Sequence, residues 1–146
     1  MKAKTLLRSA SVVALLLTIG HTAGYPWVGN VTEQQLSQIT AVKSITAVIQ
    51  GFRRSYWDFH VGFGLILTLV FFAQAVVLWR LGALSESEPR TTRFVAAVFG
   101  FFYVAATAVN FLFFFWAPIV CTSILAVCAL AASIALRPTV PSVRAA

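Results

Sequence analysis

Apolar residues along this chain gather into long continuous runs. The first extends over about residues 6–24, and the second over about residues 57–81. A third run, residues 94–136, contains no Asp, Glu, Lys or Arg. One membrane crossing needs about 20 apolar residues, so the third run is long enough for two helices. The pattern therefore predicts four transmembrane helices.

The third run is divided at Trp116-Ala117-Pro118, into spans over about residues 94–116 and 119–136. Proline disfavours helix in the residue before it and suits the first turn of the helix that follows. A connection this short makes the two spans antiparallel neighbours. Small residues predict the interface where helices approach closely: Ala96 and Gly100 in the third span, and Ala126, Ala129, Ala132, Ser133 and Ala135 in the last.

The segment between the first two spans has apolar residues at helical spacing. They recur every three or four positions, at Leu36, Ile39, Val42, Ile45, Ile49 and Phe52. Thr32 with Gln35 forms a capping box, Asn30 with Glu33 offers a second register, and Gly51 suits the position after a helix. The pattern predicts an amphipathic helix over about residues 32–50, lying on the membrane or on the bundle.

The first apolar run has two interpretations. Lys2 and Lys4 precede it, and Arg8 can extend its long side chain to the membrane surface, as expected of a span. A basic start followed by an apolar stretch and Thr22-Ala23-Gly24 is also typical of a signal peptide with its cleavage site. His21 stands where cleavage after Ala23 requires a small residue, which favours a retained span.

The composition of the chain agrees with a lipid environment. Hydrophobic residues make up 60% of it and charged residues only 10%, with a mean hydropathy of +0.87. A soluble domain carries about 25% charged residues. The net charge of +7 raises the question of nucleic acid, but the basic residues stand singly or in pairs at the edges of the apolar runs. Such positions are typical of topology determinants and contacts with anionic lipids. We expect the lipid bilayer as a partner and no nucleic acid.

The distribution of Lys and Arg predicts the orientation of the chain. With the N-terminus inside, eight of the 11 fall on the inner side, and three, Lys43, Arg53 and Arg54, on the outer side. Positive charge concentrates in cytoplasmic segments. We therefore expect a multi-pass protein of the inner (plasma) membrane with both termini cytoplasmic and the amphipathic helix extracytoplasmic. Removal of the first run would leave three spans with the same C-terminal orientation.

Polar residues at the outer ends of the spans are the candidates for a binding site. Ionisable side chains that enter a span are costly and suggest function, whereas Ser55 and Asp58 also fit a capping box with a structural role. The topology brings six residues to one side, where they are predicted to line an outward-facing pocket: His21, Arg54, Asp58, His60, Asn110 and Trp116. In that pocket an Arg54–Asp58 ion pair would hold the carboxylate ionised, and a histidine would relay a proton or anchor a ligand.

Other chemistry has less support from the residues. Two histidines leave haem binding at the outer leaflet as an alternative. Against it, both histidines lie near one membrane surface and no CxxCH motif occurs. Cys121 and Cys128 are about 10 Å apart along a helix, too far for a disulfide, and no metal-ligand spacing is found. Gly62-x-Gly64 lies inside a span, where it is expected to allow close approach of helices.

Several of these motifs together resemble a family of small bacterial four-helix membrane proteins. They are Gly20-His21, Arg54-Ser55-Tyr56-Trp57-Asp58-Phe59, Gly62-Phe63-Gly64-Leu65 and Trp116-Ala117-Pro118. A looser similarity, of topology alone, is to the DoxX-like four-helix proteins. The resemblance implies the architecture and a bacterial inner-membrane location, and it implies no reaction.

The sequence thus predicts an all-α fold, a single integral membrane domain over residues 1–146 that forms a four-helix bundle. The leading functional hypothesis is a non-enzymatic protein that binds a lipophilic small molecule or a partner membrane protein at its outer polar end. One alternative is an integral-membrane enzyme acting on a lipid or quinone, with Asp58 and either His60 or His21 as acid and base. Another is a structural subunit of a membrane complex.

Overall fold

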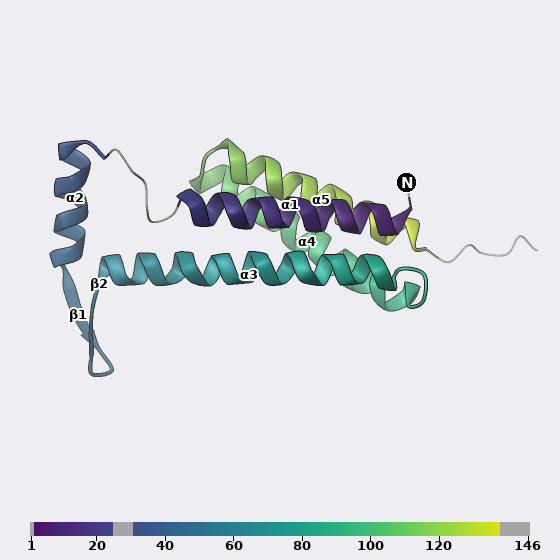
Figure 1. The fold of residues 1–146 in the computed structure, drawn as a ribbon, viewed down its shortest axis with the longest axis horizontal. Coiled ribbons are helices and arrows are strands. Elements are labelled where there is room, and N and C mark those ends of the chain that lie inside the picture. The colour runs from purple at the N-terminus through teal and green to yellow at the C-terminus, as the bar shows by residue number, and fades with distance from the viewer. Residues whose placement is uncertain (1, 25–30, 138–146) are drawn as a thin grey trace, which may run out of the picture. The chain divides into compact units, whose positions relative to one another are not determined.

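A computed structural model describes residues 2–24 and 31–137 of the chain. Their elements, shown in Figure 1, are α1 (Ala3–Gly24), α2 (Glu33–Ser44), β1 (Thr46–Ile49), β2 (Phe52–Ser55), α3 (Tyr56–Leu84), α4 (Pro89–Phe113) and α5 (Trp116–Ala135). The predicted all-α class is confirmed. The chain divides into two compact units, residues 1–17 with 73–146 and residues 18–72, and each is described by itself. α1 and α3 contribute to both.

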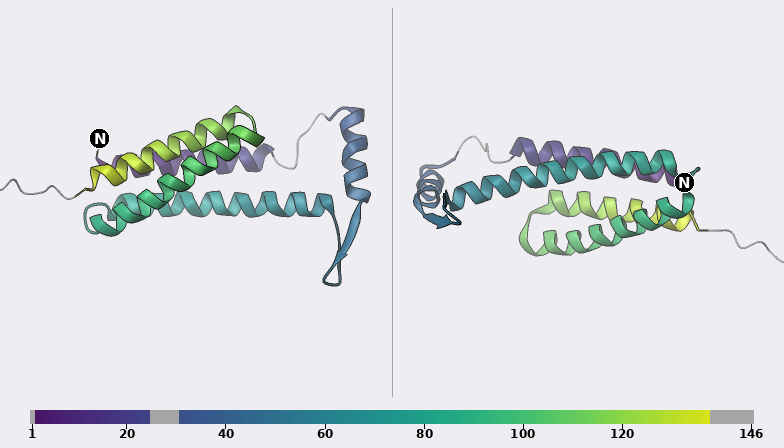
Figure 2. Two further views of the ribbon diagram at one scale, coloured as in Figure 1. Left: turned by 180° about the vertical axis from the view of Figure 1, so that it is seen from behind. Right: turned by 90° about the horizontal axis from the view of Figure 1, so that it is seen from below.

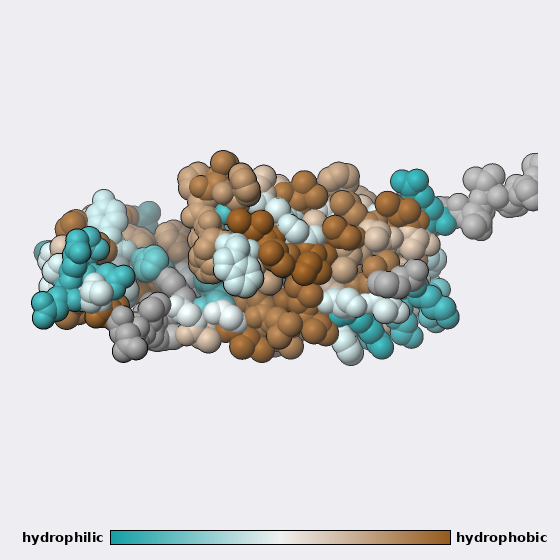
Figure 3. Space-filling model, turned by 90° about the horizontal axis from the view of Figure 1, so that it is seen from above, coloured by the Kyte–Doolittle hydropathy of each residue, from teal (hydrophilic) through white to brown (hydrophobic). Residues whose placement is uncertain are grey.

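Four helices, α1, α3, α4 and α5, are long and apolar enough to cross a membrane. Only 17% to 33% of the most apolar stretch of each helix is buried inside the protein. Large side chains such as Phe63, Leu69, Phe111 and Phe113 are between 65% and 75% exposed. The space-filling view in Figure 3 is correspondingly brown, or hydrophobic, over the long helices. Exposure of this much apolar surface to water is unfavourable, so the surroundings of these helices are lipid.

In the first unit, α4 and α5 form an antiparallel hairpin, visible in Figure 2. Ala96 on α4 is fully buried, and Gly100 faces Leu130 of α5. A Cβ atom at Gly100 would lie 2.5 Å from Cδ2 of Leu130, which leaves no room for a side chain. Ala126, Ala129 and Ala132 of α5 are buried as well. The predicted small-residue interface is therefore confirmed at these positions, whereas Ser133 is only half-buried and Ala135 is exposed, contrary to the prediction.

The same unit has a core to which all four long helices contribute. Leu7 of α1, Leu78 of α3 and Leu125 of α5 are fully buried, and Tyr103 of α4 is 1% exposed. The hydroxyl group of Ser11 on α1 donates a hydrogen bond to the carbonyl oxygen of Ala75 on α3 at 2.6 Å. Intramembrane hydroxyl groups need such partners because lipid offers none.

The turn between the last two spans begins earlier than the sequence predicted. α4 ends at Phe113, Phe114 and Phe115 make the connection, and α5 begins at Trp116. Both helices therefore begin earlier than the predicted spans 94–116 and 119–136. Pro118 lies in the first turn of α5 and not in the connection. Proline is tolerated there, where a backbone N–H has no helical partner. Pro89 occupies the first turn of α4 in the same way.

In the second unit, α2 begins with the predicted capping box. The backbone N–H of Gln35 donates to the hydroxyl oxygen of Thr32 at 3.3 Å, and the N–H of Thr32 donates to Oε1 of Gln35 at 2.9 Å. The alternative register starts at Asn30, which lies outside the described residues. The predicted helix over residues 32–50 is wrong beyond Ser44, where a β-hairpin follows.

The hairpin pairs β1 and β2 antiparallel, with Val48 opposite Arg53 and Ile49 opposite Phe52. Gln50 and Gly51 connect the strands with φ angles of +53° and +85°. A two-residue loop with positive φ at both positions matches the twist of a hairpin, and glycine adopts that conformation without strain. Gly51 is thus a turn residue and not a helix stop.

Candidate functional site

Asp58 caps the N-terminus of α3. Its Oδ2 accepts a hydrogen bond from the backbone N–H of Ser55 at 2.7 Å, and the backbone N–H of Asp58 donates to Oγ of Ser55 at 3.1 Å. These two reciprocal bonds complete the capping box that the sequence predicted. A carboxylate at this position also complements the positive end of the helix dipole. The described contacts of Asp58 are therefore those of a structural cap.

Arg54 forms no direct ion pair with Asp58 of the kind that the sequence predicted, although its charge still attracts the carboxylate from a greater distance. No ion pair joins the two side chains in this part of the described chain. Nη1 of Arg54 donates to the carbonyl oxygen of Arg53 at 2.9 Å, and its guanidinium lies 5.6 Å from the ring centre of Phe52. The reason is local: Arg54 belongs to the exposed strand β2, while the carboxylate of Asp58 is directed to the backbone of Ser55.

The two histidines lie against different neighbours in the second unit. Nε2 of His21, in the last turn of α1, is 3.0 Å from the carbonyl oxygen of Gly64 on α3. The His21 ring also meets Phe71 edge-on, with ring centres 5.6 Å apart. His60 is exposed and packs at a tilt beside Trp57, with a separation of 5.4 Å. His21 thus links α1 to α3, whereas His60 lies at the exposed surface beside Trp57.

The Gly62-x-Gly64 motif contributes to this contact through Gly64 alone. The buried Gly64 supplies the carbonyl oxygen that His21 approaches, whereas a Cβ atom at Gly62 would meet nothing within 4 Å. Close helix approach at Gly62 was therefore predicted wrongly.

Asn110 and Trp116 lie in the other unit, around the α4–α5 turn. Nδ2 of Asn110 donates to Oγ1 of Thr122 at 3.3 Å and, weakly, to the carbonyl oxygen of Pro118 at 3.5 Å. Oγ1 of Thr107 donates to the same Thr122 oxygen at 3.0 Å. Asn110 therefore joins α4 to α5, while Trp116 is 74% exposed. The gathering of these two residues with His21, Arg54, Asp58 and His60 in one pocket stays a prediction.

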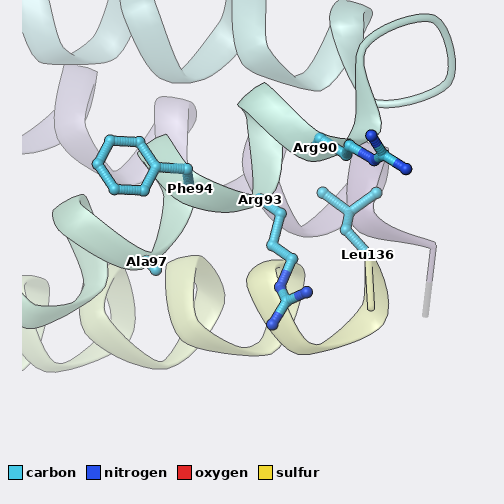
Figure 4. A pocket seen from close by; sticks show the side chains of 5 residues that line it. All are labelled: Arg90, Arg93, Phe94, Ala97 and Leu136. Atoms are coloured by element: carbon cyan, nitrogen blue, oxygen red, sulfur yellow. The ribbon is translucent and has the colours of Figure 1, made fainter. Parts of the chain in front are cut away.

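Two grooves that the sequence reasoning missed lie in the first unit. One, of about 310 Å³, is lined by Arg90, Arg93, Phe94, Ala97 and Leu136. Figure 4 shows Arg93 extending from α4 toward the last turns of α5. The other, of about 670 Å³, runs along α1 and includes Lys4, Arg8 and Trp79. In both, basic groups border an apolar wall. The sequence contained a signal for these grooves, because the basic residues stand at the edges of apolar runs, where contacts with anionic lipids are expected. The sequence did not show which basic residues share a groove.

No group of three or more His, Cys, Asp or Glu side chains in the described ranges is placed to hold a metal ion. In comparisons with protein-family models, curated proteins and solved structures, no match to this chain was found. The fold and its exposed apolar helices define the class as a multi-pass helical membrane protein. The resemblance to the bacterial four-helix family stays a prediction.

Proposed function

We propose that this protein resides in a bacterial inner membrane with both termini in the cytoplasm, and that it acts by binding a partner membrane protein at its outer end. The contact surface is the connecting segment, residues 31–55, which contains α2, β1 and β2. The observation that carries the proposal is that the apolar side chains of this segment are exposed and no other described part of the chain covers them. α2 has no buried residue, and Leu36 and Ile45 are 54% and 53% exposed.

The hairpin favours a protein partner over the lipid surface. Residues directly opposite each other in a β-hairpin share a face, and successive residues alternate between faces. Val48 therefore lies on one face, and Ile49 and Phe52 lie on the other. They are 61%, 50% and 64% exposed. A flat bilayer surface covers only one face of a hairpin, whereas a protein partner can cover both.

The charge of the segment indicates the kind of partner surface. Lys43, Arg53 and Arg54 outnumber the single acidic residue, Glu33. Nζ of Lys43 lies 5.1 Å from the ring centre of Trp57, at the start of α3. A matching surface is apolar with an acidic rim, because charge complementarity sets orientation and specificity at interfaces.

Photo-crosslinking in native membranes tests this proposal. A photoreactive amino acid at position 48 or 52 of the full chain is expected to give one discrete protein adduct. The same amino acid at position 101, on an exposed apolar position of α4, is the control and is expected to give lipid adducts. Purification through the chain should recover the crosslinked protein without irradiation, and Val48→Ser with Phe52→Ser should abolish its recovery. Lipid adducts alone at positions 48 and 52 would reject the proposal.

The alternative that His21, Arg54, Asp58, His60, Asn110 and Trp116 bind a lipophilic small molecule predicts a different result. Native mass spectrometry of the detergent-purified chain would then show a bound small molecule. The enzyme alternative requires Asp58 as acid or base, and its capping contacts with Ser55 argue for a structural role instead. Turnover of a lipid or quinone that Asp58→Asn abolishes would favour the enzyme.

A further inference from the structure

The groove along α1 combines positive charge with an apolar wall. Its polar part is formed by Lys4, Thr5, Arg8 and Ser9, and its apolar part by Val12, Val13 and Trp79. Lys4 and Arg8 are four residues apart on one helix, so their side chains lie on the same face. The groove is open and has a volume of about 670 Å³. A ligand that joins an anionic group to an apolar chain would place its charge beside the basic residues and its chain against the apolar part of the groove.

Arg8 is held in place by contacts with α3. Its guanidinium carbon lies 4.7 Å from the ring centre of Trp79. The stem of Arg8 passes Gly82, where an added Cβ atom would lie 3.1 Å from Cγ of Arg8 and 3.3 Å from the carbonyl oxygen of Lys4. Glycine at this position therefore lets α1 and α3 approach closely. A stacked, pre-positioned guanidinium binds an anion with less loss of side-chain entropy than a free one.

The hydrogen-bonding capacity of this pair is not used up within the protein. Nε of Arg8 is buried and has no hydrogen-bond acceptor in the described part of the chain. Because Nε is itself shielded from the surroundings, an external anion would bind Arg8 through the two terminal nitrogens of its guanidinium. Nζ of Lys4 is 3.8 Å from Oε1 of Glu86, whose side chain is 74% exposed. Such a long, solvent-exposed ion pair is weak and yields readily to a stronger anion.

We propose that this groove binds the headgroup of an anionic phospholipid. Lys4 and Arg8 hold the phosphate oxygens, and an acyl chain lies against Val12, Val13 and Trp79. Lipid is the source of the phosphate because α1 is a candidate membrane span and the groove enters its first three turns. A free phosphate ion would leave the apolar part of the groove unfilled. The proposal rests on the membrane location and is independent of the partner bound by residues 31–55.

Retention of lipid by the purified full chain tests the proposal. The chain is reconstituted in nanodiscs of phosphatidylcholine with a minority of phosphatidylglycerol, extracted into mild detergent, and examined by native mass spectrometry. We expect one phosphatidylglycerol to be retained in preference to phosphatidylcholine. Removing one cationic contact costs about 1 kcal/mol, so Arg8→Gln and Lys4→Gln should each weaken retention about fivefold.

Lys2→Gln is the matched control, because it removes the same charge from an exposed residue that directly precedes α1 and does not line the groove. Its retention should equal that of the unchanged protein. If Lys2→Gln and Arg8→Gln reduced phosphatidylglycerol retention equally, the lipid would be held by general electrostatic attraction, and the proposal of a specific site would be wrong. Displacement of the lipid by inorganic phosphate at equal concentration would overturn the lipid as its ligand. If Arg8→Gln fails to fold, Lys4→Gln, at a side chain that is 41% exposed, decides the outcome.

Discussion

The hydroxyl group of Tyr103 on α4 donates a hydrogen bond to Oε1 of Gln74 on α3 at 2.8 Å. Tyr103 is 1% exposed and Gln74 is half-buried, so this bond is partly shielded from the surroundings of the first unit. It joins two helices that are consecutive along the chain and both long enough to span the membrane. A polar pair buried among apolar side chains fixes which residues of two helices face each other.

Tyr103→Phe should destabilise the fold by about 0.6 kcal/mol, the typical strength of a hydrogen bond between membrane helices. The free energy of unfolding in mixed detergent micelles measures the effect. Gln74→Leu removes the other partner, and the double variant should cost less than the sum of the single ones. Strict additivity would show that the bond contributes nothing to stability.

Replacement by valine should have different effects on stability at two buried threonines. Oγ1 of Thr92 has no hydrogen-bond partner in the described ranges, so Thr92→Val should be neutral or stabilising. Oγ1 of Thr122 receives bonds from Thr107 and Asn110, so Thr122→Val should cost about 1 kcal/mol. Thermal unfolding in detergent compares the two. A loss at position 92 as large as that at 122 would contradict the unsatisfied state of Thr92.

Gly100→Ala should disrupt the α4–α5 hairpin. The new methyl group would meet side-chain atoms of Leu130 at 2.5 Å to 2.6 Å and its backbone nitrogen at 3.2 Å, so the Leu130 side chain must be displaced or the helices must move apart. Overpacking of this kind costs about 1–3 kcal/mol. Gly62→Ala is the control, because nothing lies within 4 Å of its added atom. Thermal stability in detergent should fall for the first variant only.

The β-hairpin depends on Gly51, whose φ is +85°. Gly51→Val should melt the hairpin, because a β-branched side chain is strained at positive φ. Gln50→Asn should strengthen it, since asparagine before glycine is preferred in this turn. Nuclear Overhauser contacts between Val48 and Arg53 report the pairing. Their survival in Gly51→Val would contradict the turn geometry.

The predicted orientation can be tested by cysteine labelling in intact bacteria. With Cys121 and Cys128 replaced by alanine, Gln38→Cys should react with a membrane-impermeant maleimide, and Ser87→Cys should react only after the membrane is broken. The expectation follows from the excess of Lys and Arg on the side of Ser87. The opposite labelling pattern would reverse the orientation of the chain.

The four spans were predictable because length and lack of charge alone identify a membrane helix. The ends of the spans were not predictable. A proline can stand in the connection or in the first turn of the next helix, and the sequence alone did not show that Pro118 takes the second position. The hairpin was missed because Ile45, Ile49 and Phe52 also fit a helical period. The β-branched residues of Thr46–Ile49 and the Gln50-Gly51 turn carried the competing signal.

The capping role of Asp58 was visible in its spacing from Ser55, because the contact is local. A direct Arg54–Asp58 ion pair was expected from proximity in sequence, but the carboxylate accepts a hydrogen bond from the backbone N–H of Ser55 instead. Contacts between distant segments, such as His21 with Gly64 and Arg8 with Trp79, depend on the rotation of α1 against α3. Apolar periodicity does not determine that rotation for helices that lipid surrounds.

The two-residue connection at Phe114 and Phe115 couples the positions of α4 and α5 along the bilayer normal. So short a segment spans at most about 11 Å between the last residue of α4 and the first residue of α5. The two joined helix ends therefore lie at nearly the same depth, and a displacement of one helix there carries the other with it.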